Sequence, residues 1–95
     1  MARVVLAPGL ARWMRPEPAS GEVALKVEGS TVGAVLEGVF AQHPLLRGYV
    51  LDEHRVVRHH VAVFVDGTSI ARKDALDTPV AAGGEVYVMQ ALSGG

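Results

Sequence analysis

The sequence predicts a single α+β domain in which one face of a β-sheet packs against one main helix. Three observations predict it. Several short runs alternate apolar and polar residues, as half-buried strands do. One central stretch has apolar residues spaced for a single helix face. The 95 residues are 49% hydrophobic and 20% charged, enough for one core. These segments follow the order strand, strand, helix, strand, strand, so the expected fold is a two-layer roll with four to five strands.

Two strands are expected ahead of the helix. Arg3–Ala7 is a short run of β-prone residues that a Pro-Gly pair ends. Glu22–Val27 alternates valine or leucine with small or charged residues, which gives a strand with one apolar face. The connection between them, residues 8–21, is rich in proline and glycine. It is expected to be long and irregular, with a helical turn around Leu10–Met14.

The main helix is expected to begin after Ser30-Thr31, whose hydroxyl groups can cap its first turn. The apolar residues that follow are spaced at i, i+3, i+4, i+7 and i+8 and therefore form one stripe: Val32, Val35, Leu36, Val39 and Phe40. Glu37 and Gln42 lie off this stripe. Pro44 is expected to end the helix, because the residue before a proline avoids helical backbone angles.

The second half of the chain predicts further strands. Tyr49–Leu51 is a short apolar piece, and Val56-Val57 is expected to begin an extended stretch. Val61–Val65 alternates like a strand and ends in an Asp-Gly pair, which predicts a tight hairpin with a short return at Thr68–Ala71. Glu85–Ala91 is expected to be the last strand, leading directly into the C-terminal segment.

Composition excludes several classes of function. A net charge of −1 gives no electrostatic reason to expect binding to nucleic acid or membrane. The absence of cysteine excludes a disulfide framework, a thiolate nucleophile and a zinc site built on sulfur. No apolar run is long enough to cross a bilayer, and the first residues reach a Pro-Gly pair too early for a signal peptide. A cytoplasmic protein is therefore expected.

The C-terminal residues Leu92, Ser93, Gly94 and Gly95 are the most informative segment. We expect a globular domain over residues 1–91 and a flexible tail over 92–95. Two glycines leave no side chain beside the terminal carboxylate, and they adopt backbone angles that other residues avoid. Extended, four residues reach roughly 13–14 Å. Such a tail can present the Gly95 carboxylate to the active site of another protein; the alternative is a terminus that is merely frayed.

Five segments occur in the order typical of one family: Gly29–Gly33, Val61–Gly67, Leu76–Val80, Gly83–Val86 and Ser93–Gly95. Over roughly residues 22–95, together with the first strand, the chain resembles the MoaD/ThiS family of ubiquitin-like sulfur carriers. The resemblance implies a β-grasp (ubiquitin-like) fold, in which a mixed sheet of four to five strands packs on one main helix.

The resemblance also implies a carrier and not an enzyme. An adenylyltransferase similar to the E1 enzymes of ubiquitin would activate Gly95 with ATP. A sulfur donor, either a sulfurtransferase or a desulfurase, would then convert it to a thiocarboxylate. A synthase subunit would accept the sulfur. The carrier itself would bind no cofactor, since the activating partner uses the ATP. The receiving pathway stays open between molybdopterin, thiazole, cysteine and tRNA thiolation.

Two other hypotheses remain beside the sulfur carrier. The same tail could be joined to lysines of target proteins, as in a ubiquitin-like modifier. Alternatively, the chain could be a β-grasp interaction module whose tail is never activated.

A partner must also bind the folded domain. If Val61, Val63 and Val65 face the helix, strand alternation places Phe64 on the outer face of the sheet. The same alternation in the last strand places Tyr87 and Met89 there. Phe64, Tyr87 and Met89 are therefore the predicted partner-binding patch, beside the root of the tail. The alternative is that residues 8–21, with Trp13, fold over this face.

Trp13 itself has two interpretations. Its side chain can be a lid packed on the core, or it can be a platform for a ligand.

Other candidate residues support no further site. The histidines are His43, His54, His59 and His60. His59 and His60 are expected to point to opposite faces of an extended stretch, so no metal site is expected. Asp52-Glu53, Asp74 and Asp77 are loop carboxylates without a defined partner for acid–base catalysis. A weak basic rim for an acidic partner, or simply a solvated face, is expected from three arginines: Arg55, Arg58 and Arg72.

Overall fold

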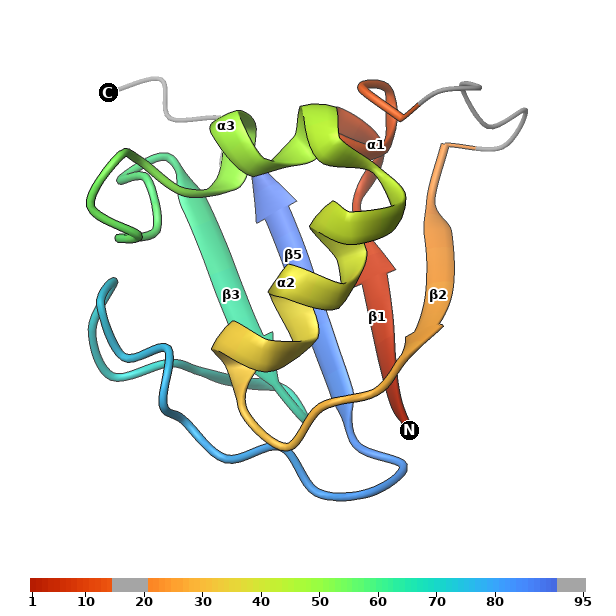
Figure 1. Cartoon of the computed structure of the whole chain (residues 1–95), viewed down its shortest axis with the longest axis vertical. Helices are drawn as coiled ribbons and strands as arrows, with labels where there is room; N and C mark the ends of the chain where they lie inside the picture. Colours follow the sequence, from red (N-terminus) through yellow and green to blue (C-terminus); the bar gives the residue numbers. More distant parts are fainter. Residues whose placement is uncertain (15–20, 91–95) are drawn as a thin grey trace.

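The fold is built on a five-stranded mixed sheet (Figure 1). A computed structural model of the chain describes residues 1–14 and 21–90. The strands are β1 (Ala2–Leu6), β2 (Val23–Val27), β3 (Val61–Val65), β4 (Thr68–Ser69) and β5 (Glu85–Gln90). They lie in the order β2-β1-β5-β3-β4, with β1 and β5 parallel and the other neighbours antiparallel. The last strand of the sequence, β5, is therefore the central strand of the sheet.

One helix, α2 (Val32–Gln42), crosses a single face of this sheet (Figure 1). It begins at Thr31, whose hydroxyl oxygen accepts a hydrogen bond from the backbone N–H of Ala34 at 3.1 Å. Three shorter helices accompany it: α1 (Pro8–Ala11), η1 (Pro44–Leu46) and α3 (Arg47–Val50). No helix within residues 1–14 and 21–90 is both long enough and apolar enough to span a membrane.

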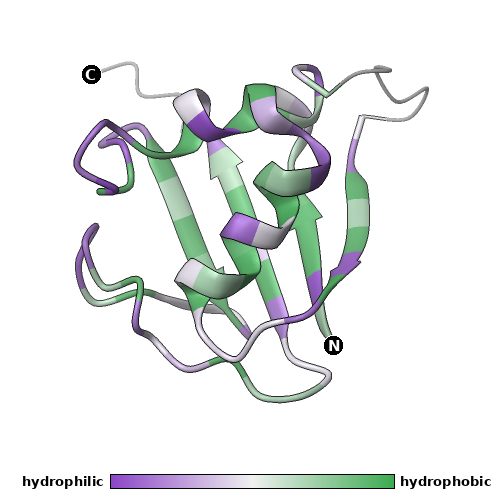
Figure 2. Ribbon diagram, in the orientation of Figure 1, coloured by the Kyte–Doolittle hydropathy of each residue, from purple (hydrophilic) through white to green (hydrophobic). Residues whose placement is uncertain are grey.

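The core lies between α2 and the facing side of the sheet. The predicted stripe of α2 is buried, with Val32 and Val35 fully enclosed and Phe40 only 4% exposed. The strands contribute the alternate residues that face α2: Val4, Leu6, Val61, Val63, Val86 and Val88. In Figure 2 the strands are mostly hydrophobic, whereas the loops beside β3 also contain hydrophilic stretches. The predicted two-layer α+β roll is confirmed.

The predicted helix and hairpin are both confirmed. The helix follows Thr31 and ends before Pro44. Asp66 and Gly67 have φ angles of 48° and 87°, and positive φ at both positions is what a two-residue turn needs to match strand twist. Val65 on β3 then pairs with Thr68 on β4. The return strand is shorter than predicted, because only Thr68–Ser69 pairs with β3.

The segment after Pro44 departs from the prediction. The structure forms η1 and α3 there, where the sequence suggested only a short apolar piece at Tyr49–Leu51. Such short helices have little propensity of their own and are stabilised by packing, here by the buried Leu46 and Val50. Val57 begins no strand; it makes a single isolated bridge with Leu51.

The start of the 8–21 connection packs on the helix side of the molecule. A helical turn is present as α1, which begins two residues earlier than the predicted Leu10–Met14, and Leu10 and Met14 belong to the core. The Trp13 ring stacks on Tyr49 of α3, with ring centroids 4.4 Å apart and an interplanar angle of 9°. Trp13 is partly buried against the core, which confirms its interpretation as a lid. Residues 15–20 lie outside the described residues.

Candidate functional site

The predicted active group, the Gly95 carboxylate, lies outside the described residues, as do the other tail residues Leu92, Ser93 and Gly94. The boundary between a domain at 1–91 and a tail at 92–95 likewise remains a prediction. What the structure does describe is the point from which this segment departs. Gln90 ends the central strand β5 and pairs with Val61 at the start of β3. The side chains around this end of the sheet are therefore the ones nearest the point where the described chain ends.

Strand alternation divides β5 between the two faces of the sheet as predicted. Val86 and Val88 are fully buried in the core beneath α2. Tyr87 and Met89 alternate with them along the strand, are partly exposed, and do not belong to that core. They therefore occupy the outer face, which α2 does not cover.

The residues of the predicted patch are direct neighbours on that outer face. Phe64 pairs with Tyr87 across the β3–β5 ladder, and Ala62 pairs with Met89. Directly opposed side chains on one face of an antiparallel pair lie close enough to contact each other. We call Ala62, Phe64, Tyr87 and Met89 the outer patch. Its Met89 end lies beside Gln90, so the patch is next to the start of the C-terminal segment.

The row of apolar residues that contains Phe64 and Tyr87 continues onto β1 with a buried residue that the sequence analysis did not select. Val5 pairs with Tyr87 on one side and with Ala24 on the other. It is only 3% exposed although it lies outside the main core. The sequence did contain a sign that Val5 is buried, namely the unbroken apolar run Val4-Val5-Leu6. A strand that is buried on both faces has consecutive apolar residues instead of alternating apolar and polar ones.

Charged residues border the outer patch at the opposite end of the strands. Arg3 and Glu85 are paired across β1 and β5, and their side chains form an ion pair at 3.5 Å. The Asp66 carboxylate accepts a hydrogen bond from the backbone N–H of Glu85 at 2.9 Å. The outer face is thus polar at one end and apolar at the end where β5 leads into the C-terminal segment.

Residues 8–14 do not cover the outer patch. Leu10, Ala11 and Met14 are buried in the core on the helix side, and Trp13 stacks on Tyr49. The alternative in which the connection folds over the outer face is therefore wrong for this part of it.

The two adjacent histidines do not behave as predicted. His59 and His60 form a turn, not an extended stretch, and their rings meet edge to face with centroids 5.3 Å apart. A turn changes the side-chain directions that strand alternation would give. Across residues 1–14 and 21–90, no group of three or more His, Asp or Glu side chains is placed to hold a metal ion.

The loop carboxylates stabilise the loops that contain them. Asp52 accepts hydrogen bonds from the backbone N–H groups of Val56 at 3.0 Å and His54 at 2.8 Å. These bonds lower the pKa of Asp52 below its ordinary value of 3.8, because they favour the ionised form. Asp74 accepts a hydrogen bond from the Nε of Arg72 at 2.9 Å.

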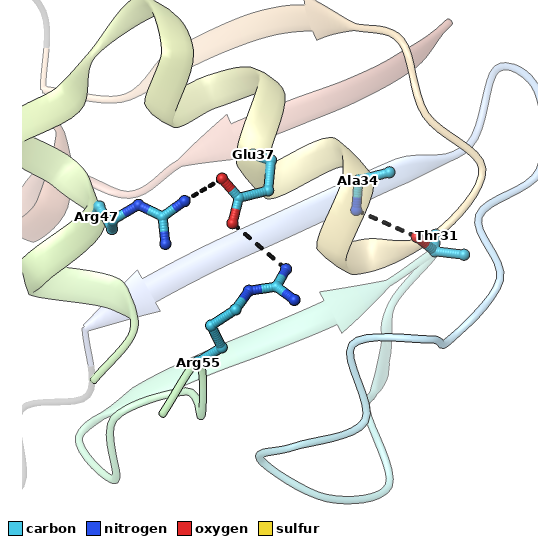
Figure 3. A network of polar contacts seen from close by, with 5 residues as sticks. All are labelled: Thr31, Ala34, Glu37, Arg47 and Arg55. Atoms are coloured by element: carbon cyan, nitrogen blue, oxygen red, sulfur yellow. Dashed lines mark hydrogen bonds and ion pairs between the residues drawn. The ribbon is translucent and has the colours of Figure 1, made fainter. Parts of the chain in front are cut away.

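The three predicted rim arginines have different partners. Figure 3 shows Glu37 of α2 between Arg47 of α3 and Arg55 of the following loop. The Arg55 guanidinium lies 3.3 Å from the Glu37 carboxylate, and Arg72 pairs with Asp74. Arg58 instead donates to the backbone oxygen of Gly48 at 2.7 Å. Of the three, only Arg58 forms no ion pair with a carboxylate within the described part of the chain.

Comparison with known proteins places this arrangement in a family. The family model of the ThiS family matches residues 13–95. SAMP1 from Haloferax volcanii is 28% identical, with a TM-score of 0.74 over 99% of this chain and 98% of that one. A chain of the Amycolatopsis orientalis BexX/CysO complex is 20% identical, with a TM-score of 0.76 over 97% and 99%.

Mycobacterium tuberculosis CysO is also 20% identical, with a TM-score of 0.73 over 94% of this chain and 99% of its own. Among curated proteins, none matches the chain significantly. The shared architecture is the β-grasp fold of ubiquitin-like proteins, and the chain belongs to the ThiS family, the ubiquitin-like sulfur carriers that its sequence resembles.

Proposed function

We propose that the chain is a sulfur carrier whose Gly95 carboxylate is adenylated and then converted to a thiocarboxylate. The observation that carries this proposal is the match to the ThiS family over residues 13–95, which includes Ser93-Gly94-Gly95. The position of β5 supports it, because the central strand leads directly toward this segment.

The proposed chemistry takes place in partner proteins. In the first step a Gly95 carboxylate oxygen attacks the α-phosphorus of ATP, which forms the acyl adenylate and releases pyrophosphate. In the second step hydrosulfide released by the sulfur donor attacks the carbonyl carbon, AMP leaves, and loss of the S–H proton gives the thiocarboxylate. Both steps need a pocket closed to water, because water would hydrolyse the adenylate. Two terminal glycines suit entry into such a pocket, since neither has a side chain to obstruct it.

The carrier contributes a surface and a tail, and the partners contribute the ATP site and the reacting groups. We propose that an adenylyltransferase, a sulfur donor and a synthase subunit contact the outer patch while they hold the tail. The patch is apolar, partly exposed and next to the end of β5. One similar chain was solved as part of a complex, the BexX/CysO complex, which supports a role that depends on a partner protein.

A second candidate function is conjugation to lysines of other proteins. It is favoured by the likeness to SAMP1, a small archaeal modifier protein, at 28% identity. The same acyl adenylate would serve both functions. In conjugation, a lysine amine attacks the carbonyl, an isopeptide bond forms, and AMP leaves.

The test is incubation of the full chain with ATP, a sulfide source and an adenylyltransferase of the ThiS-family type, followed by intact mass spectrometry. Exchange of one oxygen for sulfur supports the carrier. Adducts on lysines of added proteins support the modifier. An unchanged mass, when the same enzyme modifies its own known carrier, contradicts both.

A further inference from the structure

A second surface beside the end of β5 is lined by two permanent cations that form no ion pair with a carboxylate among the described residues. A shallow cavity of about 340 Å³ lies between the loop before β3 and the loop after β4. Arg58, His59, His60 and Lys73 line it. Figure 2 shows a hydrophilic stretch in each of these two loops.

The two permanent cations of this cavity are fixed by backbone carbonyl groups. Arg58 Nε donates to the Gly48 oxygen at 2.7 Å. The Lys73 ammonium donates to the Val61 oxygen. A backbone bond, from the Val57 N–H to the Lys73 oxygen at 2.9 Å, joins the two loops. A carbonyl orients a cation without cancelling its charge, and each head group keeps further N–H donors.

The other arginines with assigned partners differ from this pair. Arg3, Arg47, Arg55 and Arg72 each form an ion pair with a glutamate or aspartate. Neither Arg58 nor Lys73 lies within ion-pair distance of a carboxylate in residues 1–14 and 21–90. Asp52 also lines the cavity, and its carboxylate interacts electrostatically with Arg58, so it offsets one of the two positive charges. The cavity therefore keeps a net positive charge.

The positively charged cavity lies close to the end of β5. Lys73 binds the backbone oxygen of Val61, and Val61 is the residue paired with Gln90. The cavity is thus one strand away from the end of β5. A protein that takes the C-terminal segment into its active site must bring its surface against this side of the domain.

We propose that Arg58 and Lys73 form a docking site for an acidic segment of the protein that activates the C-terminal carboxylate. The proposal rests on the proposed function for the identity of that partner, and on charge complementarity and position for the site. Docking here would fix the orientation of the domain while the outer patch supplies apolar contact. Charges at the rim of an interface act mainly on the association rate and on its salt dependence.

The direct test requires no knowledge of the partner. The ¹⁵N-labelled full chain is titrated with a synthetic hexaglutamate peptide, and amide shifts are followed by NMR. We expect saturable shifts at residues 56–60 and 73. Arg58→Glu and Lys73→Glu should each weaken binding by about tenfold, since opposite charge at the site turns attraction into repulsion. Arg58→Lys and Lys73→Arg should keep it, because they preserve the charge.

Lys26 is the matched control. It is exposed on β2, at the far side of the sheet from β3, and has no ion-pair partner among the described residues. Lys26→Glu changes the net charge by the same amount and should leave hexaglutamate affinity unchanged. If Lys26→Glu lost as much hexaglutamate affinity as Arg58→Glu and Lys73→Glu, the proposed site would be overturned, because only the net charge of the protein would then matter. If inorganic phosphate bound as tightly as hexaglutamate at matched ionic strength, Arg58 and Lys73 would form a general anion site. That result would also overturn the proposal.

The partner is tested separately through the activation reaction. Arg58→Glu should raise the KM for the carrier about tenfold with kcat nearly unchanged, and added salt should shrink the difference. Wild-type KM in the variant contradicts the docking site while leaving the carrier function intact. If the wild-type chain is never activated, the proposed function fails, and the peptide titration alone then decides whether the basic site exists.

Discussion

Asp52 organises the loop between α3 and β3 through hydrogen bonds to its own backbone. Its carboxylate accepts the N–H groups of Val56 and His54, which lowers the pKa of Asp52 below 3.8. A carboxyl group whose pKa is lower in the folded state stabilises the fold above its ordinary pKa, and this stabilisation is lost as pH falls through the folded value.

Replacement of Asp52 by Asn should therefore lower the thermal midpoint at neutral pH and change it much less in acid below the folded pKa. Thermal unfolding of both proteins at the two pH values checks this. Asp77→Asn is the control, because Asp77 is exposed and its side chain makes no hydrogen bond within the described residues. A difference that stays the same at both pH values would contradict the role given to the carboxylate charge.

Gly38 sets the distance between α2 and β2. A Cβ atom built at Gly38 would lie 2.2 Å from a methyl carbon of Val27, closer than real contacts allow. Gly38→Ala should therefore lower the free energy of unfolding by about 1–3 kcal/mol. This is opposite in sign to the gain of about 1 kcal/mol that alanine gives in a free helix. Urea denaturation measures the change.

Two further variants make the Gly38 prediction specific. Gly48→Ala in α3 is the matched control, because a Cβ there meets nothing within 4 Å, and its stability should be equal or greater. Adding Val27→Ala to Gly38→Ala should recover part of the loss, since the clashing methyl group is gone. If the changes in unfolding free energy of Gly38→Ala and Val27→Ala simply added in the double variant, the proposed contact between the two residues would be contradicted.

At the scale of elements, the sequence predicted the helix and strands whose apolar residues repeat with a regular period. It missed the elements that form only because of contacts with distant parts of the chain. The stripe from Val32 to Phe40 and the alternation of Val61–Val65 required no tertiary information, because each repeats the period of its own structure. By contrast, α3 is only four residues long, and it exists because Leu46 and Val50 are buried. The turn at His59-His60 was missed for a similar reason, since residue types alone did not mark it.

The same limit applies to the candidate site. Alternation placed Phe64, Tyr87 and Met89 on one face from the sequence alone. That Phe64 directly opposes Tyr87, and that Val5 continues their row onto β1, depends on the register between strands distant in sequence. The fixed cations of Arg58 and Lys73 depend on carbonyl groups contributed by other segments.

The outer patch predicts a variant that separates binding from folding. Phe64→Asp should weaken binding to the adenylyltransferase by at least about tenfold, because it places a charge at the centre of an apolar contact. Its effect on unfolding should be smaller, since Phe64 is partly exposed and lies outside the main core. Calorimetric titration and urea denaturation measure the two effects.

Ala24→Asp provides the control for Phe64→Asp. Ala24 is exposed on the edge strand β2, in the same cross-sheet row but two strands from β5. The Ala24→Asp variant should therefore retain wild-type affinity for the adenylyltransferase. Wild-type affinity in Phe64→Asp would instead show that the outer patch is not the contact surface.

At the scale of the whole molecule, we expect the folded body to provide the stability and the terminus to provide the chemistry. Among the described residues, the core cluster draws on residues between Ala2 and Val88, and we expect the C-terminal segment to add little to it. Deletion of Gly95 should therefore abolish thiocarboxylate formation while leaving the thermal midpoint nearly unchanged. A clear loss of stability in the shortened chain would show that the terminus also serves the fold.

The most direct test of the carrier function locates the sulfur within the chain. Trypsin cleaves after Lys73, and no lysine or arginine follows that residue in the sequence, so residues 74–95 form one C-terminal fragment. After incubation with ATP, a sulfide source and the adenylyltransferase, we predict that this fragment alone gains the mass of sulfur in place of oxygen. We also predict that the gain disappears when Gly95 is deleted. Sulfur on any other fragment, or on the fragment that lacks Gly95, would contradict the account.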